Sequence, residues 1–311
     1  TCHKDSKAVA RFFAAVSLSP EVSVTAAAAN FENPVSRLNG WRMREAGCLS
    51  RMVSISTPPS AENSKNGLFV SLSKVKETNI SINSDRLWDS LMTMAKIGPG
   101  IAGGNNRQTF TVEDGEARKL LQEWSENAGM TMKVDELGSM YFKREGTDKN
   151  ALPVVIGSHL DTQPTGGKYD GVLGGLAGLE IVRTLNDLNI QTKHPILVVN
   201  WTNEEGSRFP PAMMASAGYA GIYEVESLLS AKDAEGNIFG DELNKIGWKG
   251  SEPVGAQKFH CYYELHIEQG PILETEEIDI GVVTHGQGLK WLEVKLSGVE
   301  QHTGTCLLYT S

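Results

Sequence analysis

The sequence has few of the features that mark secreted, membrane-spanning or nucleic-acid-binding proteins. It holds only 4 cysteines in 311 residues, none in C-x-x-C spacing, which disfavours a zinc ribbon or a disulfide framework. No apolar run reaches the roughly 18 residues that a membrane-spanning helix needs. The formal net charge of −9 disfavours a protein that follows nucleic-acid phosphates, and no polybasic segment indicates a membrane anchor. We therefore expect a cytoplasmic protein without nucleic-acid or membrane partners.

Charge is unevenly distributed along the chain. Residues 1–76 contain 10 Lys+Arg and 5 Asp+Glu, whereas the remainder contains 19 and 33. The first part is rich in Ser, Ala and Asn and shows no sustained helical or strand period, so we expect a disordered or non-native leader. The alternatives are an organellar transit peptide and a translated upstream region that precedes initiation near Met43 or Met52.

The last six residues, 306–311, read CLLYTS. A transposon library adapter encodes this peptide in one reading frame, and we expect the natural sequence to stop at Thr305. The alternative is an ordinary hydrophobic C-terminus.

Hydrophobic periodicity between these ends predicts alternating helices and strands. Helices are expected over 84–97, from Thr111 to just before Gly129, and over 173–188, with Ser84 as the N-cap of the first. Compact or alternating apolar runs predict strands over 130–134, 140–142, 153–157, 195–200 and 261–265.

The order strand, helix, strand over 153–200 is that of a βαβ unit. It predicts an α/β fold with a mixed, largely parallel sheet and helices on both faces. Functional side chains in such sheets gather at the carboxyl ends of the strands.

Five residues have the types and the order that two-metal hydrolases use for their ligands. They are His159 and Asp170 in GSHLDTQPTGGKYDG, Glu204 and Glu205 in NWTNEEG, and His266 in ELHIEQG. Two divalent cations about 3.5–4 Å apart repel each other, so such a site needs a bridging carboxylate and further ligands from separate segments. Three of these segments follow predicted strands, and we expect them to converge at one edge of the sheet.

Each residue also has a simpler interpretation. A single histidine at a strand end is more often structural, adjacent glutamates are usually a solvated pair, and YDG is usually a turn. Their joint occurrence at strand ends favours the metal site.

Residues from about 80 to 305 resemble the hydantoinase/carbamoylase branch of the aminoacylase and carboxypeptidase-G-like metallohydrolases. The group includes N-carbamoyl-L-amino-acid hydrolase, β-ureidopropionase and allantoate amidohydrolase. The resemblance rests on GSHLDTQPTGGKYDGVLGGLAGLE, NWTNEEGSRFPPAMMASAGYAG, ELHIEQGPILE and, less completely, GVEQHTGT.

The resemblance implies that His159, Asp170 and His266 bind one divalent metal ion, and that Asp170 bridges to a second ion held by Glu205. Glu204 would be the general base, acting on a metal-bound water that ionises near neutral pH. Zinc is the expected metal, and manganese, cobalt and nickel suit the same ligands.

Three further residues have roles implied by the resemblance. Asp161 would hydrogen-bond the imidazole of His159 and fix its tautomer. His302 would donate to the oxyanion from a lid domain, often across a homodimer, and Gln269 would contact substrate.

The implied domain division places the first part of a di-metal catalytic domain at 77–287 and the start of the α+β lid domain at 288–305. The last metal-binding histidine and the substrate-carboxylate arginine of the family have no counterpart after Thr305. We therefore expect this chain alone to be inactive or nearly so.

Three functions remain open at this point. The first is hydrolysis of N-carbamoyl amino acids, either N-carbamoyl-β-alanine, which the 159–171 loop favours, or N-carbamoyl-L-amino acids. The second is an allantoate amidohydrolase or a dipeptidase of the same group. The third, from another class, is a non-catalytic binding protein that retains the fold.

Overall fold

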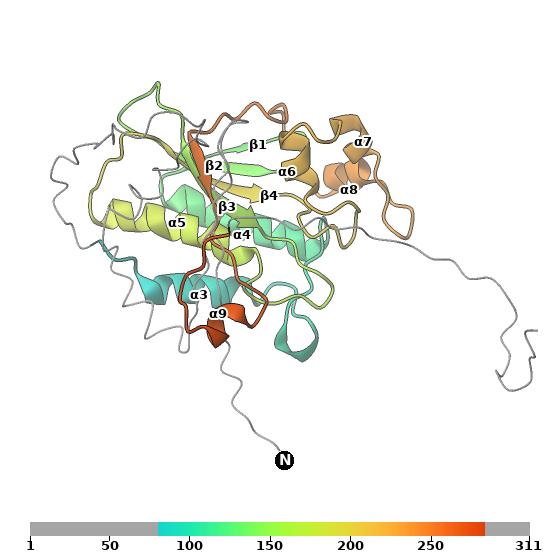
Figure 1. The fold of residues 1–311 in the computed structure, drawn as a ribbon. Helices are drawn as coiled ribbons and strands as arrows, with labels where there is room; N and C mark the ends of the chain where they lie inside the picture. The colour runs from blue at the N-terminus through green and yellow to red at the C-terminus, as the bar shows by residue number, and fades with distance from the viewer. Residues whose placement is uncertain (1–79, 284–311) are drawn as a thin grey trace, which may run out of the picture.

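The computed structural model describes residues 80–283, which form a five-stranded sheet with helices packed on it (Figure 1). The helices are α3 (Ser84–Met94), α4 (Val112–Asn127), α5 (Val172–Asp187), α6 (Met214–Tyr219), α7 (Val225–Leu229), α8 (Phe239–Lys245) and α9 (Ile272–Thr275), with a short 3-10 helix at Ile101–Gly103. The strands are β1 (Thr131–Val134), β2 (Met140–Arg144), β3 (Val154–His159), β4 (Ile196–Trp201) and β5 (Cys261–Tyr263). Within these residues, no helix has both the length and the apolar composition needed to cross a membrane.

The sheet is mixed, as predicted. Its strands lie in the order β1-β2-β4-β3-β5. Strand β3 pairs in parallel with both β4 and β5, while β2 pairs antiparallel with β1 and with β4. The carboxyl ends of β4, β3 and β5 therefore lie at the same edge of the sheet, which is where side chains from separate segments can meet.

Helices approach the sheet from both sides. On one face, α5 lies so close to the strands that a Cβ added at Gly178 would be 3.1 Å from the side chain of Val198. Helix α3 packs in turn on α5, away from the sheet (Figure 1). Trp201 lies three residues after Val198 and so points to the opposite face, where its ring contacts Tyr219 of α6 with centroids 5.4 Å apart. The expectation of helices on both faces is confirmed.

The N-cap predicted for α3 is wrong by one residue. Asn83 caps the helix, because its carboxamide oxygen accepts a hydrogen bond from the backbone N–H of Arg86 at 3.0 Å. Ser84 is instead the first helical residue and is buried. For α4, the predicted cap is confirmed, since the Thr111 hydroxyl accepts from the N–H of Asp114 at 3.3 Å.

Several element ends differ from the predicted ranges. Helix α3 ends at Met94 rather than at residue 97, and β5 ends at Tyr263. Strand β3 continues through His159, so this residue closes the strand rather than following it. The predicted leader (1–76), lid start (288–305) and adapter-derived tail (306–311) lie outside the described residues, and the domain boundaries remain predictions.

We expect Gly157→Ala to destabilise the fold, because β3 and β4 leave no space for a side chain at this position. A Cβ at Gly157 would lie 2.3 Å from Cγ1 of Val199 and 2.4 Å from its carbonyl oxygen. Overpacking of this kind should lower the free energy of unfolding by about 1–3 kcal/mol, measured by urea denaturation.

The matched control is Gly115→Ala in α4, where an added Cβ meets none of the described residues within 4 Å. Alanine is the better helix former, so this variant should gain about 0.5–1 kcal/mol in the same measurement. Destabilisation of similar size in both variants would contradict the packing argument.

Candidate metal centre

The ends of β3 and β4 bring the predicted metal ligands to one edge of the sheet. His159 and Trp201 are the last residues of β3 and β4 and are register partners. Glu204 follows Trp201 after two residues, and His266 follows the neighbouring strand β5 after Glu264 and Leu265. The parallel strand directions therefore account for the convergence of these segments.

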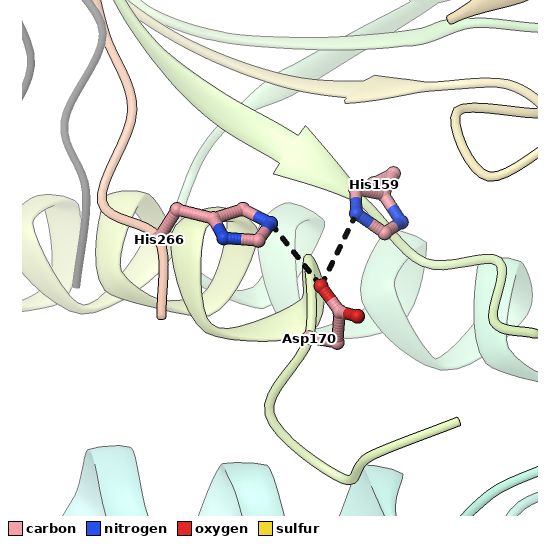
Figure 2. Close-up of side chains that lie close together, drawn as sticks. All are labelled: His159, Asp170 and His266. Atoms are coloured by element: carbon pink, nitrogen blue, oxygen red, sulfur yellow. Dashed lines mark ion pairs between the residues drawn. The ribbon is translucent and has the colours of Figure 1, made fainter. Parts of the chain in front are cut away.

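Two histidines and an aspartate face one another at this edge (Figure 2). Nε2 of His266 lies 3.2 Å from Oδ1 of Asp170, and Nε2 of His159 lies 3.8 Å from the same oxygen. One ligand atom from each of the three residues lies within 4.8 Å of the others. A single cation between them would be in reach of all three.

The electrostatics of this cluster favour a positive charge at His159. Burial lowers the pKa of His159, but the charges of Glu204, Asp161, Asp170 and Glu205 outweigh it and raise the pKa to about 9. Nε2 of His159 is buried and has no hydrogen-bond partner among the described residues. A divalent cation would replace the proton on this nitrogen, and imidazole nitrogens beside several carboxylates are ligands that such cations accept, so the residues present fit the predicted metal.

Glu204 stands at the mouth of the cluster. Its Oε2 lies 3.4 Å from Nε2 of His159, and its side chain is 33% exposed. Burial is the main cause that raises the pKa of Glu204, and the neighbouring Asp161 and Glu264 charges act in the same direction. The side chain is thus beside the cluster and still reachable from solvent, as a proton-transfer group must be.

Glu205 lies next to the cluster but outside the three-residue group. Its Oε2 accepts a hydrogen bond from Nε2 of Gln163 at 3.0 Å, while its Oε1 is buried without a partner in the described part of the chain. Burial, with a contribution from Asp170, raises the pKa of Glu205 to about 7. Oε1 of Glu205 is therefore available to bind a cation.

Asp161 contacts His159 through a different atom from the one predicted. Nδ1 of His159 meets the backbone carbonyl of Asp161 at 2.9 Å, whereas the Asp161 carboxylate is 3.8 Å away, beyond hydrogen-bond distance. That carboxylate instead accepts from the backbone N–H groups of Glu204 and Glu205, at 3.2 and 3.1 Å. The path of the main chain after β3 brings the carbonyl of Asp161, rather than its carboxylate, next to the ring of His159.

The two remaining predicted residues have different outcomes. Gln269 donates from its side-chain amide to Oδ2 of Asp170, so it supports a candidate ligand. Its role toward substrate stays a prediction. His302 lies outside the described residues.

Comparison with known proteins identifies the family. Residues 155–305 match the model of peptidase family M20/M25/M40. This chain carries an M20 peptidase domain. The chain is similar to the N-carbamoyl-L-amino-acid amidohydrolase of Rhizobium meliloti, with 66% identity over 73% of this chain and 55% of the relative. The enzyme of the same name from Geobacillus stearothermophilus is 38% identical over 72% of this chain and 55% of its own length.

A solved structure gives the same result. An amidase of the hydantoinase/carbamoylase family from Burkholderia multivorans superposes with a TM-score of 0.63 and 51% identity. The superposition covers 64% of this chain and 49% of the amidase. The chain therefore spans about half the length of the relatives it matches, and the fold prediction is confirmed for the M20 domain.

Glu264 is a residue of the M20 domain that our sequence analysis missed. Its carboxylate accepts hydrogen bonds from the hydroxyls of Ser158 at 2.6 Å and Tyr262 at 2.7 Å, and Tyr262 accepts in turn from Nε1 of Trp201 at 3.1 Å. The sequence signal was an acidic residue between apolar neighbours at the end of a buried strand run.

Asn203 was missed as well, although it precedes Glu204. It is fully buried with φ 56°, in the left-handed region that asparagine tolerates better than most residues. Its side chain accepts from the Thr109 hydroxyl at 2.9 Å and donates to the carbonyl of Phe209 at 2.7 Å. These bonds fix the turn that presents Glu204.

We expect Gly171→Ala to weaken metal binding by the M20 domain. Gly171 follows Asp170 with φ 65°, and a Cβ there would lie 2.4 Å from ring atoms of His159. The imidazole would have to move, and we expect affinity for Zn²⁺ to fall at least about tenfold in a chelator competition assay, the lower end of the loss seen when a metal ligand loses its support.

The control for this variant is Gly175→Ala, one helical turn later in α5. No described atom lies within 4 Å of a Cβ at that position. Its Zn²⁺ affinity should match the wild type, and an equal loss in both variants would show that the His159 contact is not the cause.

Proposed function

We propose that this chain is the metal-binding part of a metal-dependent amidohydrolase that cleaves the C–N bond of N-carbamoyl amino acids. The observation that carries the proposal is the convergence of His159, Asp170 and His266, in which the buried Nε2 of His159 faces carboxylates but has no hydrogen-bond partner in the described structure. The Rhizobium meliloti relative supports it, because it is named an N-carbamoyl-L-amino-acid amidohydrolase and is 66% identical over the shared region.

In this proposal, His159, Asp170 and His266 would hold one divalent cation, and Asp170 together with Glu205 would hold a second. The donor set of imidazole and carboxylate suits zinc, with manganese, cobalt and nickel as alternatives. When bound, such cations supply Lewis-acid chemistry, which makes a water molecule more acidic and polarises the substrate carbonyl. The neutralisation of several crowded carboxylates would accompany their binding.

Glu204 moves the protons of the reaction. Its partly exposed carboxylate takes a proton from the attacking water and returns it to the departing nitrogen. Burial raises the pKa of Glu204 and so brings the acid and base forms closer in free energy near neutral pH, which favours a group that must act in both roles. His302 as oxyanion donor and a homodimeric assembly belong to the same proposal.

The names of the relatives favour N-carbamoyl-L-amino acids as substrates over N-carbamoyl-β-alanine. Both relatives from Rhizobium meliloti and Geobacillus stearothermophilus are named for the L-amino-acid reaction. Gln163, Glu204 and Gln269 contact Glu205, His159 and Asp170, so their polar groups lie beside the cluster and could bind a carbamoyl head.

The activity can be tested in a chimera. The 227 residues that match the Rhizobium meliloti relative would replace the corresponding part of that enzyme. We expect the chimera to hydrolyse N-carbamoyl-L-amino acids faster than N-carbamoyl-β-alanine, allantoate or a dipeptide. Glu204→Gln should lower kcat by about 10²–10⁴-fold, the usual contribution of general acid–base catalysis. An unchanged kcat in Glu204→Gln would contradict the role of Glu204, and a chimera that folds but is inactive would contradict the proposed activity.

Metal binding by the chain itself is tested by thermal unfolding. A ligand at 100 times its Kd stabilises the state that binds it by about 2.7 kcal/mol, so Zn²⁺ should raise the Tm. His266→Ala should remove most of this increase. His194→Ala is the matched control. His194 precedes β4 and so lies at the amino ends of the parallel strands, away from the site, and this variant should keep the Zn²⁺-dependent increase in Tm. A similar Zn²⁺ response in wild type and His266→Ala would argue against the site.

A further inference from the structure

Arg107 is a buried charged side chain with no carboxylate at ion-pair distance among the described residues, although the charges of Asp114 and Asp161 stabilise it from farther away. Its exposure is 0%, and it forms no ion pair among residues 80–283. Nε donates to the carbonyl of Leu160 at 2.9 Å, and Nη1 donates to the carbonyls of Ile97 at 2.9 Å and Met94 at 3.5 Å. Burial of a guanidinium is costly and lowers the pKa of Arg107, so the bonds to main-chain carbonyls are needed to compensate for the lost solvation.

The guanidinium joins two parts of the chain. Met94 ends α3, and Ile97 lies just beyond it, so Arg107 satisfies carbonyls at the carboxyl end of that helix. Leu160, on the other side, is the first residue after β3. Arg107 thereby ties the segment that leaves β3 to the end of a packed helix.

The main chain of Arg107 strengthens this connection. Its N–H donates to the hydroxyl of Thr162 at 2.8 Å, and its carbonyl accepts from the N–H of Thr162 at 2.9 Å. With the bond to Leu160, three hydrogen bonds hold residues on both sides of Asp161. Asp161 is therefore fixed in position by Arg107 although the two residues share no hydrogen bond.

Asp161 connects the segment held by Arg107 to the candidate metal site. Its carbonyl orients the imidazole of His159, and its carboxylate holds the backbone of Glu204 and Glu205. A shift of the segment from Leu160 to Thr162 would move a metal ligand and the proton-transfer group at the same time.

We propose that Arg107 is a positioning residue of the metal site, acting through the segment from Leu160 to Thr162. The inference rests on the proposed function, since it assumes that the cluster binds a divalent cation. It assigns a role to a residue that touches neither the cation nor the substrate.

The test compares the 311-residue chain with three variants, Arg107→Met, Arg107→Lys and Arg144→Met. Arg144 is the matched control, because it is also buried and donates to the carbonyl of Ile190 at 2.7 Å and the side chain of Asn186 at 2.9 Å. It pairs with Ile196, the first residue of β4, whereas the site lies beyond the last residue of β4.

Co²⁺ is the probe, because its visible spectrum reports ligand geometry and its affinity can be measured by chelator competition. Thermal unfolding of the metal-free proteins reports stability separately. We expect Arg107→Met to lose about 10–100-fold in Co²⁺ affinity and to change the spectrum, with partial recovery in Arg107→Lys. Arg144→Met should lose thermal stability but keep the affinity and spectrum of the wild type.

The outcomes are distinguishable. Wild-type affinity and spectrum in folded Arg107→Met would overturn the positioning role while leaving the proposed function in place. If Arg107→Met does not fold, Arg107→Lys decides, and unchanged Co²⁺ binding in it would overturn the inference. A wild-type chain that binds no Co²⁺ would refute the metal site and the inference together.

Discussion

The segment after β3 links the parts of the site through one residue. The carbonyl of Asp161 meets Nδ1 of His159, and its carboxylate holds two successive N–H groups after β4. These bonds couple the ends of two adjacent parallel strands, and the buried Asp161 carboxylate has two backbone donors to offset its desolvation. The backbone positions of Glu204 and Glu205 therefore depend on the position of Asp161, and so does the orientation of the His159 ring.

The site concentrates negative charge among buried and partly buried side chains. Burial disfavours the charged form of a carboxyl group, and it raises the pKa of Glu204 and Glu205. Asp170 behaves differently: burial raises its pKa, but the contacts with His266 and His159 outweigh burial and lower it. Positive charge is thus the condition under which these side chains can remain together, and either imidazolium or a divalent cation would supply it.

Much of the fold follows from local sequence patterns, and less of the site does. The apolar runs before His159 predicted central strands, whereas the short helices within 214–245 have too few turns for a clear period and depend on tertiary packing. The convergence of His159 and His266 could be predicted because parallel strands present their ends together, while their role as metal ligands stays a prediction. The contact atom of Asp161 could not, since it depends on the path of the backbone. Arg107 and Glu264 gave little signal, because a charged residue in an isolated sequence normally indicates a surface position.

The third residue of the cluster, His266, follows the least extensive strand of the described sheet. Strand β5 pairs with β3 over only three residue pairs and lies at the edge of the described sheet, while His159 ends β3, which has a strand on each side, and Asp170 directly precedes the N-cap of α5. Edge strands of this length open locally without global unfolding. Fraying of β5 would swing His266 away and leave a two-ligand intermediate, so the lifetime of a bound ion would follow the opening rate of this edge rather than the unfolding rate of the domain.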